Sequence, residues 1–183
     1  MQAALDTCFL IDWAYYRERE TLKQLFDKLI IIEKVLNEVK SERTLTLISK
    51  WLSEDFLYII PITNQIEKTA ESITRMVTVN STLPRVEEPE IYGLAIAKIY
   101  NVPLLSENKG ALRLTYLLPE LEGVKVLRAL DILSMLIKRR ILKAQTKNDV
   151  KKIFEDYCKD TKHLFPVKDL NATLNKLYRL NVD

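Results

Sequence analysis

A chain of 183 residues is long enough for one globular domain with an appendage, and its content of 48% hydrophobic and 29% charged residues is typical of a soluble globular protein. The 28 Lys and Arg residues exceed the 25 Asp and Glu residues by three, a balance that permits attraction to nucleic acid without requiring it. The three glycines are too few and too scattered for a phosphate-binding loop or a dinucleotide fingerprint, and one histidine, His163, excludes a multi-histidine zinc site.

The sequence also predicts where the protein resides. Cys8 and Cys158 lack the spacing of a metal site, which favours a reduced, cytoplasmic compartment. The first residues reach Asp6 without a basic segment ahead of an apolar one, so no signal peptide is expected. No uncharged apolar run approaches 18 residues, so no membrane partner is expected. Because histidine and cysteine are scarce, carboxylates are the groups left for any catalysis.

Short apolar runs alternate with helical patterns along most of the chain. Buried strands are predicted at 3–5, 29–32, 56–60, 102–105 and 124–126. Helical patterns lie between and after them, at 7–16, 20–26, 35–40, 44–52, 63–76, 91–100, 109–118 and 129–140. This alternation predicts an α/β fold in which helices flank a central parallel sheet.

Local signals refine the helix boundaries. Thr63 is suited to cap the helix that follows it, and the polar segment 77–85 with Pro84 indicates a loop. Pro89 suits the first position of a helix, which makes Glu88 the expected cap.

The C-terminal part of the sequence shows helical patterns without strands. These patterns lie at 150–158 and 170–177. We therefore divide the chain into a domain at 1–142 and a helical tail at 143–183, which packs on the same core or faces a partner.

Acidic and amide side chains follow the predicted strands. Asp6 comes directly after the first strand, Glu38 lies on the first turns of the helix after the second, and Glu88 begins a later helix. Glu107 and Asn108 follow the strand that ends in Leu-Leu. Because ligands of parallel sheets bind beyond the carboxyl ends of the strands, these residues are candidates for one common site.

Several carboxylates at one point repel one another unless a cation neutralises them. Mg²⁺ and Mn²⁺ prefer such oxygen ligands, lower the pKa of a bound water and stabilise an in-line phosphoryl displacement. This chemistry needs no histidine, cysteine or serine nucleophile, which agrees with the composition of this chain.

Four segments resemble the motifs of PIN-domain nucleases, and their order and spacing together carry the resemblance. They read ALDTCFLIDWA, KLIIIEKVLNEV, EEPEIYGLAIAKIYNVPLLSENKGALR and KVLRALDILSMLIKRRIL. The resemblance spans about residues 1–142, with a looser match to a helical tail. It implies a PIN-like three-layer sandwich with a C-terminal helical appendage.

The resemblance also assigns site residues. Four positions match the catalytic, metal-binding acids of the family: Asp6, Glu38, Glu88 and Asn108. Ser106 matches a supporting hydroxyl, and Glu90 is a nearby supporting acid. Asn108 departs from the family pattern because aspartate is usual there, so Glu107 becomes a further candidate metal ligand. Asparagine lacks the negative charge of aspartate, which affects the affinity of the site for a second metal ion.

The implied function is metal-dependent cleavage of RNA by a hydrolase that uses Mg²⁺ or Mn²⁺. Lys109 and Arg113 lie near the predicted site and are the expected contacts to the RNA backbone. Many members of the family are toxins of toxin–antitoxin pairs, which implies an antitoxin protein and a second copy of the chain as partners. The alternative is a catalytically silent PIN-like module that binds RNA or a protein.

Simpler interpretations of the same residues remain open. Asp6, Glu88 and Asn108 would each serve as a helix cap, and Glu90 suits the first turn of a helix. Cys8 is expected in the core and His163 at the surface or in a linker.

Overall fold

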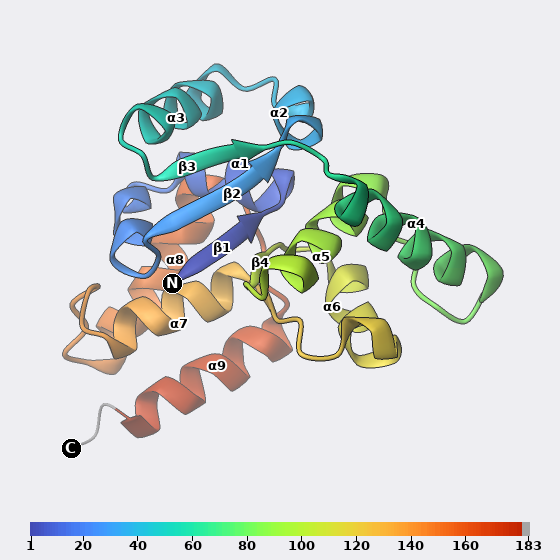
Figure 1. Ribbon diagram of the computed structural model, residues 1–183. Coiled ribbons are helices and arrows are strands. Elements are labelled where there is room, and N and C mark those ends of the chain that lie inside the picture. The colour runs from blue at the N-terminus through green and yellow to red at the C-terminus, as the bar shows by residue number, and fades with distance from the viewer. Residues whose placement is uncertain (181–183) are drawn as a thin grey trace.

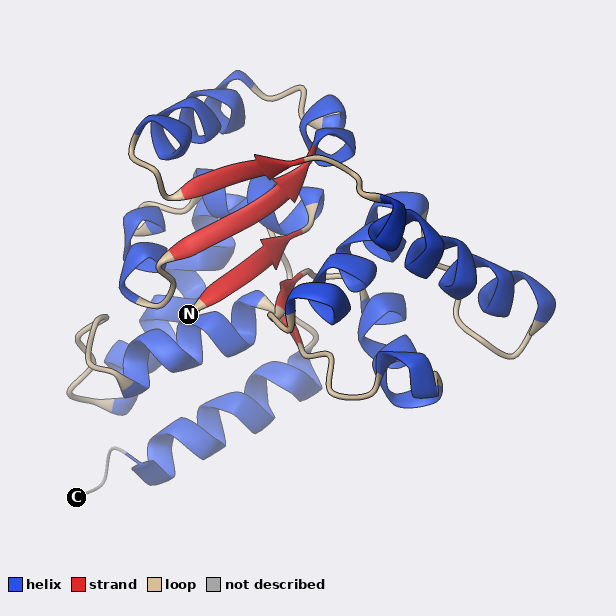
Figure 2. Ribbon diagram, viewed as in Figure 1, coloured by secondary structure: helices blue, strands red, loops and turns tan. Residues whose placement is uncertain are grey.

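The computed structural model describes residues 1–180 and contains a five-stranded, all-parallel sheet (Figures 1 and 2). The strands are β1 (Gln2–Leu5), β2 (Lys28–Ile32), β3 (Leu57–Ile60), β4 (Leu104–Leu105) and β5 (Val126–Leu127). Aliphatic side chains dominate the three central strands and are almost completely buried, as expected for parallel strands covered on both faces. The predicted α/β class and the existence of each predicted strand are confirmed.

The strand order is β3-β2-β1-β4-β5. In the centre of the sheet, Ala4 of β1 pairs with Ile30 of β2 on one side and with Leu104 of β4 on the other. The chain therefore builds outward from β1 in one direction and then returns to build in the other. The point of reversal lies between β1 and β4, which is where parallel sheets open a crevice at their carboxyl edge.

Helices connect the strands and cover the sheet. Figure 1 shows α1 and α8 behind the sheet, and α4 and α5 beyond the tips of the strands. The helices are α1 (Thr7–Tyr15), α2 (Glu33–Glu38), α3 (Glu42–Ser53), α4 (Asn64–Val79), α5 (Glu88–Tyr100), α6 (Lys109–Leu117), α7 (Ala129–Lys138), α8 (Lys147–Thr161) and α9 (Val167–Leu180), with 3₁₀ turns at Arg19–Gln24 and Pro119–Leu121. None of the helices described for residues 1–180 is both long and apolar enough to cross a membrane.

The structure tests three predicted helix boundaries: it confirms one and differs from two. Thr63 does cap α4, because its hydroxyl accepts a hydrogen bond from the Ile66 N–H at 3.3 Å. The expected helix at 20–26 is instead a 3₁₀ turn at Arg19–Gln24. The expected cap Glu88 is wrong: the helix begins at Glu88 itself, Glu87 occupies the cap position, and no side-chain bond forms there.

The tail packs on the same core as the rest of the chain. α8 contacts α1 and α7, and α9 contacts α7 and α8. Tail side chains are buried in the single core cluster, namely Phe154, Tyr157, Phe165, Leu174 and Leu177. The segment 143–180 therefore completes the core, and residues 181–183 of the predicted tail lie outside the described residues.

Candidate carboxylate site

Asp6, Ser106 and Asn108 meet at the carboxyl edge of the sheet, where β1 and β4 end side by side. The Asp6 N–H donates to the Leu105 carbonyl at 3.0 Å, which ties the two strand ends together. Asp6 follows β1 directly, and the segment from Ser106 to Asn108 follows β4. This is the topological switch point of the sheet, which is the position where parallel sheets commonly bind ligands.

Asp6 is a buried carboxylate that does not cap its helix. It occupies the cap position of α1, but its side chain forms no cap bond. Instead its Oδ2 accepts a hydrogen bond from the Ser106 hydroxyl at 2.9 Å. Burial raises the pKa of Asp6 to about 6, with smaller contributions from the negative charges of Glu90 and Glu38, while the Ser106 bond acts against this rise. The cap interpretation of this side chain is therefore wrong.

Glu90 lies in the first turn of α5 and is 7% exposed. Its Oε1 accepts a hydrogen bond from Asn108 Nδ2 at 2.9 Å, whereas its Oε2 is buried without a hydrogen-bond partner among the described residues. A buried carboxylate oxygen without a partner is costly, because the group has lost its water without replacement. A cation or a hydrogen-bond donor near Glu90 Oε2 would therefore be favourable.

The side-chain amide of Asn108 makes two hydrogen bonds, one with its oxygen and one with its nitrogen. Its Oδ1 accepts a hydrogen bond from the Ala111 N–H at 3.0 Å and caps α6, as the simpler interpretation predicts. Since the carbonyl oxygen must face that N–H, the amide orientation is defined and Nδ2 faces Glu90. Asn108 therefore presents a hydrogen-bond donor to the site, where an ionised aspartate would present acceptors only.

Glu38 reaches the site from the end of α2 and not from its first turns as predicted. Its exposed side chain accepts a hydrogen bond from the Thr7 hydroxyl at 2.5 Å. Thr7 is not among the predicted site residues, although its hydroxyl group, directly after Asp6 in the sequence, pointed to a role in the site. Thr7 places Glu38 beside the first turn of α1.

Glu88 does not join these residues. Its side chain is 65% exposed and forms an ion pair with Lys34 at 2.6 Å. Residues two positions apart on a helix point about 200° apart, so Glu88 and Glu90 cannot both face the same crevice. The structure gives the buried position to Glu90, which the sequence had assigned a supporting role.

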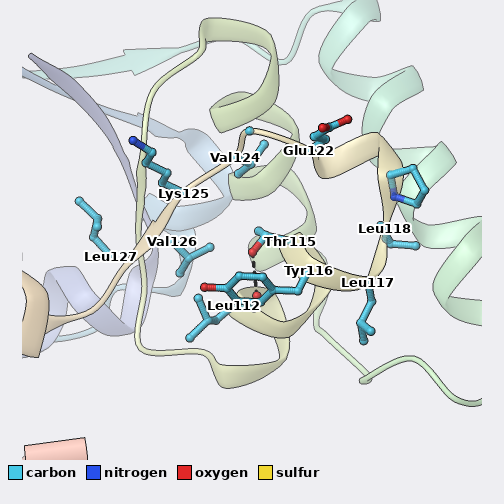
Figure 3. Close-up of a pocket in the computed structure, with 12 residues that line it drawn as sticks. Leu112, Thr115, Tyr116, Leu117, Leu118, Glu122, Val124, Lys125, Val126 and Leu127 are labelled. Carbon is cyan, nitrogen blue, oxygen red and sulfur yellow. Dashed lines mark hydrogen bonds between the residues drawn. The ribbon is translucent and has the colours of Figure 1, made fainter. Parts of the chain in front are cut away.

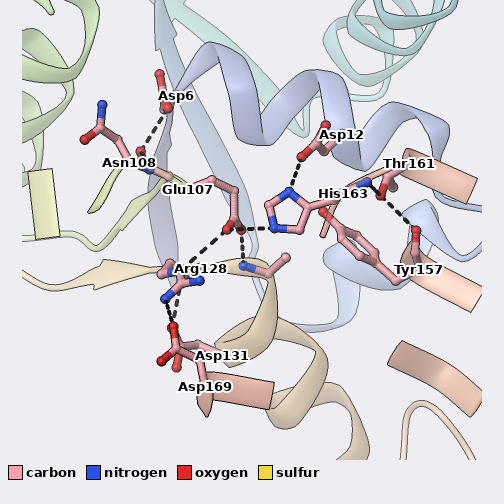
Figure 4. Close-up of polar contacts among 12 residues, drawn as sticks. Asp6, Asp12, Glu107, Asn108, Arg128, Asp131, Tyr157, Thr161, His163 and Asp169 are labelled. Carbon is pink, nitrogen blue, oxygen red and sulfur yellow. Dashed lines mark hydrogen bonds and ion pairs between the residues drawn. The ribbon is translucent and has the colours of Figure 1, made fainter. Parts of the chain in front are cut away.

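Glu107 also turns away from the carboxylates. Neighbouring residues of an extended segment point in opposite directions. Ser106 donates to Asp6 and Asn108 donates to Glu90, whereas Glu107 points toward His163 of the tail (Figure 4). Its Oε1 accepts a hydrogen bond from the Ala129 N–H at 2.5 Å. In this arrangement Glu107 stabilises the start of α7 and is not placed to share a cation with Asp6.

The donor chemistry of the site fits a hard divalent cation. Asp6, Glu38 and Glu90 supply carboxylate oxygens, and Glu90 Oε2 has no partner among the described residues. Across residues 1–180, however, no three or more His, Cys, Asp or Glu side chains are already grouped at metal-binding distances. Each acid is instead held by a neutral donor: Ser106, Thr7 or Asn108.

The negative charges of the site also affect the thiol of Cys8. Desolvation raises the pKa of its thiol to about 11, and the charges of Asp6 and Glu90 contribute to the rise. The residue is exposed, so its predicted core position is wrong. A thiol in this environment stays protonated at neutral pH and is a poor nucleophile.

The expected RNA contacts lie at the start of α6. Lys109 is the first residue of this helix, directly after Asn108, and Arg113 follows one turn later. Both side chains are exposed. They are available as positive charges next to the carboxylate site.

A separate groove of about 600 Å³ lies between α6 and the segment 122–127 (Figure 3). Exposed Tyr116 and Leu117 contribute to its wall. None of the residues that line it belongs to the carboxylate site, so the groove and the site are different features.

No protein-family model matches the sequence, and no curated protein matches it. The fold and the site therefore define the class by themselves. The protein is an α/β protein with a parallel five-stranded sheet flanked by helices and with two buried acids, Asp6 and Glu90, near the switch point of that sheet.

Proposed function

We propose that this protein is a PIN-like, divalent-metal-dependent ribonuclease. The observation that carries the proposal is the pairing of Asp6 with Glu90 at the switch point. Asp6 is buried with a raised pKa, and Glu90 beside it has a buried oxygen without a partner among residues 1–180. Such a pair is unfavourable without a cation and well suited to one.

Asp6, Glu90 and Glu38 would hold Mg²⁺ or Mn²⁺, and a cation bound there supplies Lewis-acid catalysis for phosphodiester hydrolysis. The protein's own residues prepare the ligands. Ser106 favours the ionised form of Asp6 by donating to Oδ2. Asn108 and Thr7 orient Glu90 and Glu38 in the same way.

RNA is the proposed substrate because cationic side chains adjoin the carboxylates. Lys109 and Arg113 are exposed on the first turns of α6. Contacts from such residues go to the phosphates, hold the backbone and carry no sequence information. The proposal therefore includes backbone binding at this helix without base readout.

The test is cleavage of a mixed single-stranded RNA in the presence of Mn²⁺, Mg²⁺ or EDTA. We expect wild-type protein to cleave with either metal and not with EDTA, and Asp6→Asn to lose cleavage. Glu120→Gln removes an exposed acid outside the site and is the matched control. Cleavage by Asp6→Asn at the wild-type rate would contradict the proposal.

One observation favours a second candidate, a catalytically silent RNA- or protein-binding module. The Asn108 amide already donates to Glu90, which partly compensates that carboxylate without a metal. For such a module, calorimetry would detect RNA binding without Mn²⁺ binding. Tight Mn²⁺ binding that disappears in Asp6→Asn favours the nuclease instead.

A further inference from the structure

A second polar cluster lies next to the carboxylate site, on the side of the tail (Figure 4). At its centre is His163, in the loop between α8 and α9. Its Nδ1 lies 2.9 Å from Asp12 Oδ2, and its Nε2 lies 3.4 Å from Glu107 Oε2. His163 therefore lies in a linking segment, as predicted, but its imidazole side chain is only 17% exposed and contacts the core-facing acids instead of pointing into solvent.

An imidazole between two carboxylates is stabilised in its doubly protonated form. The hydrogen bond that His163 donates to Asp12 raises the pKa of His163, and the charges of Glu107 and Asp12 contribute further, whereas partial burial and Arg128 oppose the rise. Both ring nitrogens then carry a proton, and the ring is attracted to both acids. His163 thereby links α1, the segment after β4 and the tail.

Glu107 connects this cluster to the carboxylate site through the backbone, although its own side chain points away from the site. It stands between Ser106, which donates to Asp6, and Asn108, which donates to Glu90. Its Oε1 is held by the Ala129 N–H at 2.5 Å. Its Oε2 has no hydrogen bond of good geometry among the described residues, and the ion pair with His163 Nε2 is the shortest charged contact to it.

Arg128 is the other cation beside Glu107. Its Nε lies 3.6 Å from Glu107 Oε2, but its Nη1 is directed at Asp169 of α9 at 3.0 Å. Arg128 is therefore shared between the segment after β4 and the tail. His163 is the cation whose Nε2 edge is directed at Glu107.

We infer that His163 is a positioning residue of the carboxylate site. By holding Glu107, it defines the segment 106–108 and so presents Ser106 to Asp6 and Asn108 to Glu90. The effect on catalysis rests on the proposed function, whereas the effect on the segment 106–108 does not. The tail thus contributes to the site without contacting it.

A role restricted to anchoring the tail is the competing explanation, and the structure offers a matched control for it. Arg17 forms a two-pronged ion pair with Asp160 of α8, at 2.7 and 2.8 Å. Asp160→Ala loosens the tail at this second attachment and touches neither Glu107 nor the segment 106–108.

The experiment compares wild type, His163→Leu, His163→Arg and Asp160→Ala by hydrogen exchange of the Asn108 and Ala129 amides, without metal or RNA. The Asn108 N–H is bonded to the Ser106 hydroxyl and the Ala129 N–H to Glu107, so both amides report on this segment. A lost bond to a charged group predicts roughly tenfold or faster exchange in His163→Leu. Asp160→Ala should match wild type, and His163→Arg, which restores a cationic donor, should recover protection.

Equal exchange in His163→Leu and Asp160→Ala would overturn the inference. With active wild type, we also expect His163→Leu to lower kcat by about tenfold or more at little change in KM, and His163→Arg to restore it. An unchanged kcat in His163→Leu likewise overturns the inference. Wild type that does not cleave contradicts the proposed function alone, and hydrogen exchange then decides the inference.

Discussion

Asp6 shows how a single buried side chain links stability to function. Its carboxylate is 2% exposed, and burial together with Glu90 and Glu38 keeps its pKa at about 6. The ionised form is the one that a cation would bind, yet it is the form that the fold stabilises least without a cation. The same burial that makes the site useful therefore lowers the stability of the empty site at neutral pH.

The raised pKa of Asp6 predicts a pH dependence of stability. In the unfolded chain Asp6 titrates near its ordinary value of 3.8, so the folded state holds more protons between about pH 4 and pH 6. Its contribution is fully present below that ordinary value and is lost as the pH rises through about 6, lowering the free energy of unfolding by about 2–3 kcal/mol. Urea unfolding across this range measures it, and Asp6→Asn should remove this component. A component of equal size in Asp6→Asn would contradict the assignment.

Glu90 and Glu88 provide a second prediction at the same scale. Glu90 is buried beside Asp6, whereas Glu88 is exposed and paired with Lys34. We expect Glu90→Gln to weaken Mn²⁺ binding by about tenfold or more and Glu88→Gln to change it little. Titration calorimetry with Mn²⁺ distinguishes the two, and the opposite order would restore the assignment made from sequence.

Among the elements, α6 is decisive because its first turn is built into the site. Asn108 caps the helix with one end of its amide and holds Glu90 with the other. The loop 80–87 also approaches this turn closely: a Cβ at Gly110 would lie 2.8 Å from Val86 Cγ1 and 3.1 Å from the Arg85 carbonyl oxygen. The glycine is required by this approach between two segments.

Gly110→Ala should therefore displace the first turn of α6. The added Cβ would also lie 2.9 Å from Asn108 Oδ1, so relief of the clash moves the residue that holds Glu90. We expect a loss of about 1–3 kcal/mol of stability, as for other overpacking substitutions. Thermal unfolding measures the loss, with Lys109→Ala, an exposed neighbour on the same helix, as the control. Equal stability of the two variants would show that the loop yields without cost.

On the scale of the whole molecule, aromatic packing joins the tail to the core. The Tyr157 ring of α8 lies 5.8 Å from the ring of Trp13 in α1 and 5.5 Å from that of Phe165, measured between centroids. Trp13 and Tyr157 are completely buried. Aromatic contacts of this kind add to the burial of apolar area. The tail thus contributes a layer of the core.

Tyr157 supplies the prediction for this layer. Its hydroxyl is buried and makes no hydrogen bond with any described residue, so the phenolic oxygen stays desolvated without compensation. Tyr157→Phe should leave stability unchanged or raise it by up to about 1 kcal/mol, whereas Tyr157→Ala should lower it by about 3–5 kcal/mol. Chemical denaturation of both variants gives the comparison. A large loss in Tyr157→Phe would reveal a partner for the hydroxyl.

Much of the fold was predictable because local signals there agree with the tertiary structure. Runs such as Leu29–Ile32 are so uniformly apolar that they must be buried on both faces, and Thr63 has the side chain that a helix start requires. The helix expected at 20–26 was less predictable, because only packing decides whether a short segment forms an α-helix or a 3₁₀ turn.

The candidate site, like the fold, was predictable only in part. Residue order was enough to place acids after the strands, and so to place Asp6 at the carboxyl edge of a parallel sheet. That Glu90 and not Glu88 is buried there, and that His163 contacts Glu107, follows from how the helices and the tail pack. Residue order defines which strand or helix carries a side chain. What that side chain faces depends on how elements distant in the sequence pack against it.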